Sequence, residues 1–299
     1  MGSISKVFLF LLLTCRPPAQ SENELILHQH ETGVKIIVVN KQLPLLKILL
    51  PGQSPSERGI EVEFPEHVTG LNKQTNSVEH IYLVTRDNNR TLPAWKIAGD
   101  ILSYETEFNN SIKMVAKVQL ERDGVRYSYT LTNHSDISYD KLQAVTCVKL
   151  YSLFSDTLLE RTYVHHPNGF ELLASETPER LTMPLTQWFP CRYLVSYTWP
   201  VASRRVERDE DSITRYNKSR KADKPFIATF SHDKKWVAAT YTRETGNLWT
   251  NPERSCQHAD PSVMLRPGES ETLQLKTFII KGGLDQVLQL TENESAKKD

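Results

Sequence analysis

A short polar segment towards the C-terminus carries the side chains of this sequence that are best suited to chemistry. The segment reads "NLWTNPERSCQHADPS" and covers residues 247–262. Within twelve positions it offers an indole, an amide, a guanidinium, a thiol, an imidazole and a carboxylate, on Trp249, Asn251, Arg254, Cys256, His258 and Asp260. Imidazole has the ordinary pKa nearest neutrality, about 6.5. We therefore interpret His258 as the candidate acid or base, with Asp260 as the carboxylate that orients it or stabilises its positive charge.

The residues beside that pair are suited to hold a sugar. Trp249 would offer an apolar ring face, and Asn251 and Arg254 would offer hydrogen bonds to hydroxyl groups. A structural interpretation stands beside this one, because polar residues between two prolines also hold loops together through bonds to nearby backbone amides. In that case His258 is a buried, satisfied histidine. Both interpretations stay open, and the sequence does not decide whether the protein is an enzyme.

The spacing within the segment argues against a metal site. If residues 256–260 are extended, Cys256, His258 and Asp260 share one face, with neighbours about 7 Å apart and the outer pair about 13 Å apart. Zinc needs donors at about 2.0–2.3 Å, so two adjacent members could bind one ion but three could not. A metal at His258 and Asp260 would need ligands from elsewhere, such as His165 or His166. We expect no metal and no cofactor.

The cysteines are predicted to have structural roles. Cys147 lies in the apolar run "LQAVTCVKLYSLF" and is expected to be buried and inert. Cys191 and Cys256 are the candidate disulfide, which would anchor the polar segment covalently. An odd number of cysteines after export would leave one thiol unpaired.

Alternating apolar residues dominate the rest of the chain. Residues 112–120 and 125–131 alternate on either side of Asp123 and Gly124, a strong hairpin signal. Many further short runs read as strands, and only residues 284–294 read as a helix. The predicted fold is all-β: a large antiparallel sandwich of two sheets with a short C-terminal helix. Residues 204–224 carry thirteen charges of mixed sign and are expected to form a solvated loop or an exposed ribbon.

The N-terminus predicts export. Lys6 precedes the short apolar run "VFLFLLLTC" and a polar exit, the pattern of a signal peptide over residues 1–20. Residues 21–299 are then one domain in a secreted or periplasmic protein. Lipoprotein anchoring at Cys15 is the less favoured alternative, because Thr14 departs from the usual small residue. The run is too short to span a bilayer, so no transmembrane segment is expected.

The charges offer no attraction to nucleic acid, because Lys plus Arg and Asp plus Glu number 36 each. The sequence therefore predicts no nucleic-acid partner, and it leaves the oligomeric state open.

Two stretches resemble galactose-mutarotase-like proteins: "VRYSYTLTNHSD" at residues 125–136 and "LRPGESETLQLKTFII" at residues 265–280. Residues 226–261 are similar to uncharacterised exported bacterial proteins within or near that superfamily. The resemblance implies the two-sheet "supersandwich" fold and a carbohydrate ligand. It implies a carbohydrate-binding or carbohydrate-processing protein, and an enzyme of this kind would be an isomerase, lyase or hydrolase. The mutarotase pattern of a His acid with a Glu base does not map onto this chain. The alternative is a non-catalytic structural or envelope-associated protein.

Overall fold

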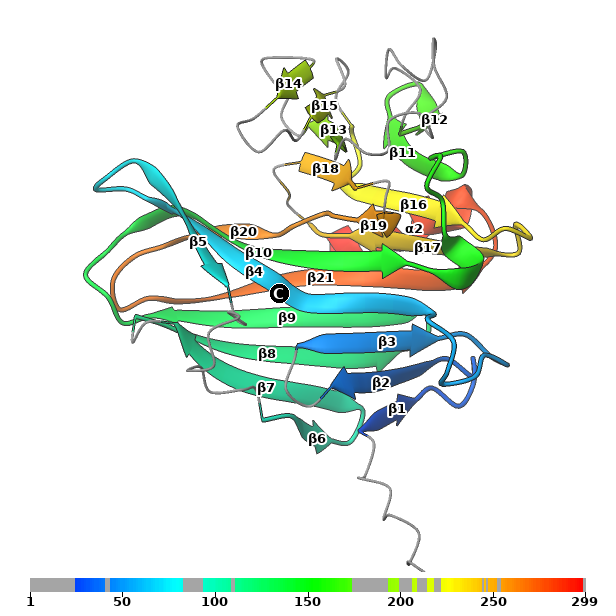
Figure 1. Cartoon of the computed structure of the whole chain (residues 1–299), viewed down its shortest axis with the longest axis horizontal. Coiled ribbons are helices and arrows are strands. Elements are labelled where there is room, and N and C mark those ends of the chain that lie inside the picture. The colour runs from blue at the N-terminus through cyan, green and yellow to red at the C-terminus, as the bar shows by residue number, and fades with distance from the viewer. Residues whose placement is uncertain are drawn as a thin grey trace, which may run out of the picture.

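Two large antiparallel sheets form the body of the protein (Figure 1). The computed structural model describes residues 25–40, 44–82, 94–108, 111–173, 193–198, 206–208, 214–217, 222–243, 245, 247–251 and 254–297. The predicted signal peptide, with Cys15, lies outside these residues, and so does Cys191. No helix among the described residues is long and apolar enough to cross a membrane.

The first sheet has eight strands, in the order β1-β2-β3-β4-β10-β19, with β5 paired to β4 and β20 paired to β10. Their bounds are β1 Ile26–His28, β2 Lys35–Asn40, β3 Leu45–Leu49, β4 Ile60–Asn72, β5 Ser77–Tyr82, β10 Tyr139–Leu150, β19 Cys256–Gln257 and β20 Ser262–Leu265.

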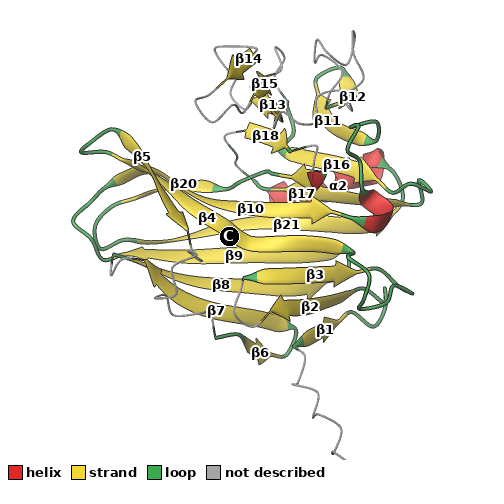
Figure 2. Ribbon diagram, viewed as in Figure 1, coloured by secondary structure: helices red, strands yellow, loops and turns green. Residues whose placement is uncertain are grey.

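The second sheet has nine strands, in the order β12-β11-β16-β17-β21-β9-β8-β7-β6. Their bounds are β12 Gly169–Leu172, β11 Thr162–His166, β16 Phe226–Phe230, β17 Trp236–Tyr241, β21 Ser270–Lys281, β9 Gly124–Asn133, β8 Ile112–Glu121, β7 Ile101–Phe108 and β6 Lys96–Ala98. Strands dominate the molecule (Figure 2). The predicted all-β sandwich is confirmed.

The main core lies between the two sheets and follows the alternation of the sequence. Side chains of one parity along each strand turn inwards, as Val62 and Phe64 do on β4 and Tyr127 and Tyr129 do on β9. The predicted hairpin is also confirmed, since β8 and β9 pair across the turn that ends at Gly124. That glycine has φ 153°, and a Cβ there would lie 2.1 Å from the carbonyl oxygen of Thr277.

The predicted C-terminal helix is α2, Leu284–Ala296. Its buried residue Val287 packs with Phe226, Val237 and Phe278, which lie on the face of the nine-stranded sheet that points away from the main core. The helix therefore covers the outside of this sheet at β16, β17 and β21. A single turn of 3-10 helix, Ser152–Phe154, follows β10.

A small third sheet was not predicted. It has the order β14-β15-β13-β18, with β14 Val206–Arg208, β15 Thr214–Asn217, β13 Tyr193–Thr198 and β18 Asn247–Thr250. Within residues 204–224, where the sequence indicated a solvated loop or an exposed ribbon, the structure has two short strands, β14 and β15. β15 pairs in parallel with β13, a long-range contact that leaves no local pattern in the sequence.

Candidate functional site

The candidate site lies on the outward face of the eight-stranded sheet, the face turned away from the main core. On β10, Ala144 and Val148 point into the core, so the alternate residues Cys147 and Lys149 point outwards. Glu63 lies directly opposite Cys147 on β4. Lys149 is buried and forms an ion pair with Glu63.

The short strand β19 brings the polar segment onto this face. It pairs with β10 so that Gln257 lies opposite Val148 and Cys256 lies opposite Lys149. The Gln257 amide points inwards: its oxygen accepts a hydrogen bond from Thr240 Oγ1 at 2.9 Å, and its nitrogen donates to another threonine. Cys256 therefore points outwards.

His258, which directly follows β19, lies in a row with Glu63 of β4, Cys147 of β10 and Trp249 of β18. Its backbone bridges Trp249 of β18, with N–H to O distances of 3.0 and 3.2 Å. One further step of the β10–β19 register places His258 opposite Cys147. The ligand atoms of Cys147, Cys256 and His258 all lie within 4.8 Å of one another, and all three residues are buried.

A bulge in β4 adds a second carboxylate. Between the paired positions Glu63 and His67, three residues of β4 face one residue of β10. The last of the three is Glu66, and its carboxylate, that of Glu63 and the Cys147 sulfur lie within 4.8 Å of one another. We call Glu63, Glu66, Cys147, Cys256 and His258 the outer-face cluster.

Asp260 is held beside His258 as the sequence predicted, but inside the protein. Its Oδ2 lies 3.5 Å from His258 Nδ1, and both side chains are only 1% exposed. Oδ1 accepts a hydrogen bond from the backbone N–H of Thr146 at 2.9 Å, and Oδ2 accepts one from Trp249 Nε1 at 3.1 Å. The predicted catalytic pair is therefore brought together, but by a buried network.

The three predicted substrate-binding residues lie in different environments. The Trp249 ring stacks on the His258 imidazole, with centroids 3.6 Å apart and planes 9° apart, so His258 covers one ring face. Asn251 is 3% exposed, and its backbone N–H donates to the Cys256 sulfur at 3.2 Å. Only Arg254 is exposed.

The electrostatics of the cluster favour a charged pair. Burial acts to raise the pKa of Cys256, but hydrogen bonding from Cys147 and the charge of His258 lower it well below its usual value. For His258, burial acts to lower the pKa, but Cys256 and Asp260 raise it to about 10. Both shifts act in the direction of a thiolate beside an imidazolium. Burial also raises the pKa of Glu66.

The other predicted partners of the segment lie elsewhere. His165 pairs with Asp223 at 2.6 Å and His166 pairs with Glu171 at 2.8 Å, so neither joins His258. Among the described residues Cys256 has no disulfide partner, and its sulfur neighbours Cys147, which the sequence had assigned to a buried and inert position. Because Cys191 lies outside the described residues, its pairing stays a prediction.

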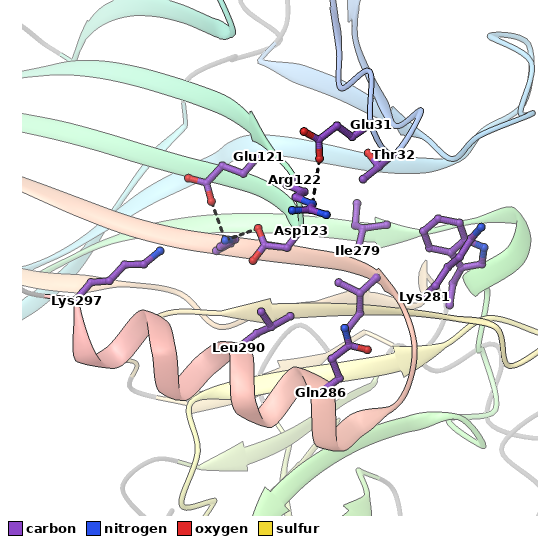
Figure 3. A pocket seen from close by; sticks show the side chains of 13 residues that line it. Glu31, Thr32, Glu121, Arg122, Asp123, Ile279, Lys281, Gln286, Leu290 and Lys297 are labelled. Carbon is purple, nitrogen blue, oxygen red and sulfur yellow. Dashed lines mark ion pairs between the residues drawn. The ribbon is translucent and has the colours of Figure 1, made fainter.

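A hollow in the described part of the chain lies in a different place. A pocket of about 790 Å³ lies between the turn at Glu31, the β8–β9 hairpin, β21 and α2 (Figure 3). At its edge the buried Lys276 ammonium is already paired with Glu121 and Asp123, each at 2.7 Å. None of the predicted site residues lines it.

Comparisons with known proteins give a likeness of fold. No protein-family model and no curated sequence matches this chain. Among solved structures, a protein from Synechocystis is 12% identical, with 92% of this chain and 100% of that chain covered and a TM-score of 0.49. A galactose mutarotase related enzyme from Lactobacillus acidophilus is 8% identical over 86% of this chain and 97% of that chain, with a TM-score of 0.45.

The α-N-acetylgalactosaminidase NagBb from Bifidobacterium bifidum is 9% identical, with 89% of this chain but 38% of that chain covered and a TM-score of 0.50. This chain therefore corresponds to one part of that enzyme. Galactose mutarotase-like proteins are among the solved structures that match this chain, so the predicted likeness to them is confirmed for the fold. The similarity of residues 226–261 to exported bacterial proteins stays a prediction.

Proposed function

We propose that this protein binds a carbohydrate on the outward face of the eight-stranded sheet, over the outer-face cluster. The observation that carries the proposal is the half-buried carboxylate of Glu66, which the β4 bulge places beside buried polar groups. Carboxylates accept hydrogen bonds from sugar hydroxyls, and the exposed guanidinium of Arg254 would donate to them. The fold adds support, since one protein that shares it is an N-acetylgalactosaminidase whose structure is a GalNAc complex. Fold alone does not specify function, so the site residues must carry the test.

Within this proposal the predicted catalytic pair has a positioning role. His258 and Asp260 are each 1% exposed, so a sugar would contact Glu66 and Arg254 rather than the imidazole. The pair fixes β19 and Trp249 behind the sugar. Binding is therefore the function that the geometry supports best, and any reaction would be tested after a ligand is found.

The proposal includes export. Residues 1–20 have the composition of a signal peptide. Its test is to fractionate the producing cell and sequence the N-terminus of the mature protein. Mature protein outside the cytoplasm that starts near residue 21 is expected, and an intact N-terminus in the cytoplasm would contradict export.

A thermal-unfolding screen against mono- and oligosaccharides tests the binding site. A ligand at ten times its Kd stabilises the native state by about 1.4 kcal/mol, which raises Tm by roughly 2–5 °C in a domain of this size. We expect Glu66→Gln and Arg254→Ala to reduce the shift. Two matched controls should retain it: Glu105→Gln on β7, and Arg122→Ala, whose side chain is 82% exposed.

Two results would contradict the proposal. One is the absence of a shift across a broad panel in correctly folded protein, which favours the structural alternative. The other is a shift that survives both site substitutions, which would move the sugar to another surface.

A further inference from the structure

We propose that Cys147, Cys256 and His258 bind a metal ion, and that zinc is the ion that best suits them. Thiolate sulfur and imidazole nitrogen are the donors typical of zinc sites in proteins, including sites with two cysteines and one histidine. This site shares the outer-face cluster with the proposed carbohydrate function, but it does not rest on that function and is tested without any sugar.

The distances suit a single ion. The three donor atoms lie within 4.8 Å of one another. Tetrahedral zinc with bonds of about 2.0–2.3 Å places its donors about 3.3–3.8 Å apart, so shifts on the order of 1 Å close the site. All three residues are at most 3% exposed, so solvent water has little access to their donor atoms.

The fold supplies the donor that the local sequence lacks. Along the chain, the polar segment offers Cys256 and His258 on one face, which is too few ligands for a structural zinc site. Strand β10 runs antiparallel beside β19 and places Cys147 opposite His258. Three ligands therefore come from two paired strands, whose hydrogen bonds hold them in register.

A second observation points to a missing partner. The Nδ1 atom of His258 is buried and has no hydrogen-bond partner among the described residues. Asp260 Oδ2 lies 3.5 Å away, close enough for an ion pair with a protonated ring, but the two atoms do not meet hydrogen-bond geometry. Leaving a buried polar atom without a hydrogen bond destabilises the folded state, so such atoms are rare in native proteins. A bound ion would resolve this: it would take one ring nitrogen and turn the other towards Asp260, as carboxylates do for zinc-bound histidines.

Glu66 is the nearest oxygen donor for a fourth position. Its carboxylate lies within 4.8 Å of the Cys147 sulfur, whereas Glu63 is engaged by Lys149. Two thiolates, a neutral imidazole and one carboxylate around Zn²⁺ would leave one net negative charge beside the Lys149–Glu63 ion pair.

Metal content and cobalt binding test the proposal on the wild-type full chain. The protein is reduced with a thiol-free reductant, freed of metal with a chelator and titrated with Zn²⁺ or Co²⁺. We expect one ion per chain, a thiolate-to-cobalt absorption band, and a rise in Tm of about 5 °C at a metal concentration of about 100 times Kd. Cys147→Ser, Cys256→Ser and His258→Asn should each lose the ion, and His134→Asn, at an exposed histidine, should retain it.

The wild-type measurements do not depend on how well the variants fold. Reduced, folded wild type that binds neither Zn²⁺ nor Co²⁺ would overturn the proposal. So would protein from its native compartment that contains no zinc and has a disulfide between Cys147 and Cys256. Sugar binding that persists in the presence of the chelator would leave the carbohydrate proposal standing when the metal proposal fails.

Discussion

Replacing Asp260 by alanine is the sharpest test of the buried network behind the candidate site. The carboxylate is 1% exposed and accepts two hydrogen bonds, from the backbone N–H of Thr146 at 2.9 Å and from Trp249 Nε1 at 3.1 Å. It also provides negative charge 3.5 Å from His258 Nδ1. In Asp260→Ala the buried N–H of Thr146 and the part-buried Nε1–H of Trp249 both lose their acceptor.

The cost follows from those two donors. Leaving a buried donor unsatisfied costs about 1–3 kcal/mol, so the loss in the free energy of unfolding should be about 3–5 kcal/mol. Asp260→Asn keeps one carbonyl oxygen and should lose roughly half as much. A matched control lies on β10, where Asp140 is exposed and forms only a surface ion pair with Lys73 at 3.6 Å. Asp140→Ala should cost less than about 1 kcal/mol.

Urea unfolding of the metal-free protein measures these differences, because the midpoint and slope give the free energy of unfolding in water. A loss of under about 1 kcal/mol in Asp260→Ala, similar to that of Asp140→Ala, would refute the reasoning. It would mean that the N–H groups of Thr146 and Trp249 find other acceptors.

Two further predictions concern the frame that holds the site. Burial acts to raise the pKa of Glu294, but hydrogen bonds from Lys297, Arg126 and Lys276 lower it to about 2. The stability that the Glu294 carboxylate contributes is complete above the unfolded-state pKa of about 4.5 and is lost as pH falls towards 2. The loss is up to about 3 kcal/mol in the free energy of unfolding, and Glu294→Gln should not show it on acid unfolding. Identical pH profiles for wild type and Glu294→Gln would contradict this expectation. Gly124→Ala should cost more than about 2 kcal/mol in urea unfolding, because its Cβ would overlap the facing backbone carbonyl of β21; a wild-type midpoint would show that the hairpin relaxes freely.

Much of the fold could be predicted because its signals are local. The alternation over 112–120 and 125–131 directly marks the faces that pack into the core. The helix over residues 284–294 was visible from its period and its apolar face. The four-stranded sheet was missed because its pairing depends on distant partners: β13 joins β15 in parallel and β18 in antiparallel pairing.

The sequence predicted only the part of the site that lies within residues 247–262. His258 and Asp260 come together because they are two positions apart in an extended segment and so share one face, and the sequence showed this. Cys147 could not be connected to them from the sequence, since only the β10–β19 register places it there. Glu66 depends on a bulge in β4, which alternation alone does not reveal. Exposure was misjudged for Asn251, which resembles a sugar-binding residue in the sequence but is buried.

The central claim is that a carbohydrate binds over the outer-face cluster, and calorimetric titration tests it most directly. The sugar that gives the largest thermal shift would be titrated into wild type, Glu66→Gln and Glu105→Gln. We predict one sugar per chain, an affinity at least about tenfold weaker in Glu66→Gln, equivalent to about 1.4 kcal/mol, and no change in Glu105→Gln. Equal affinities in all three proteins, or no binding heat for any sugar, would contradict the claim.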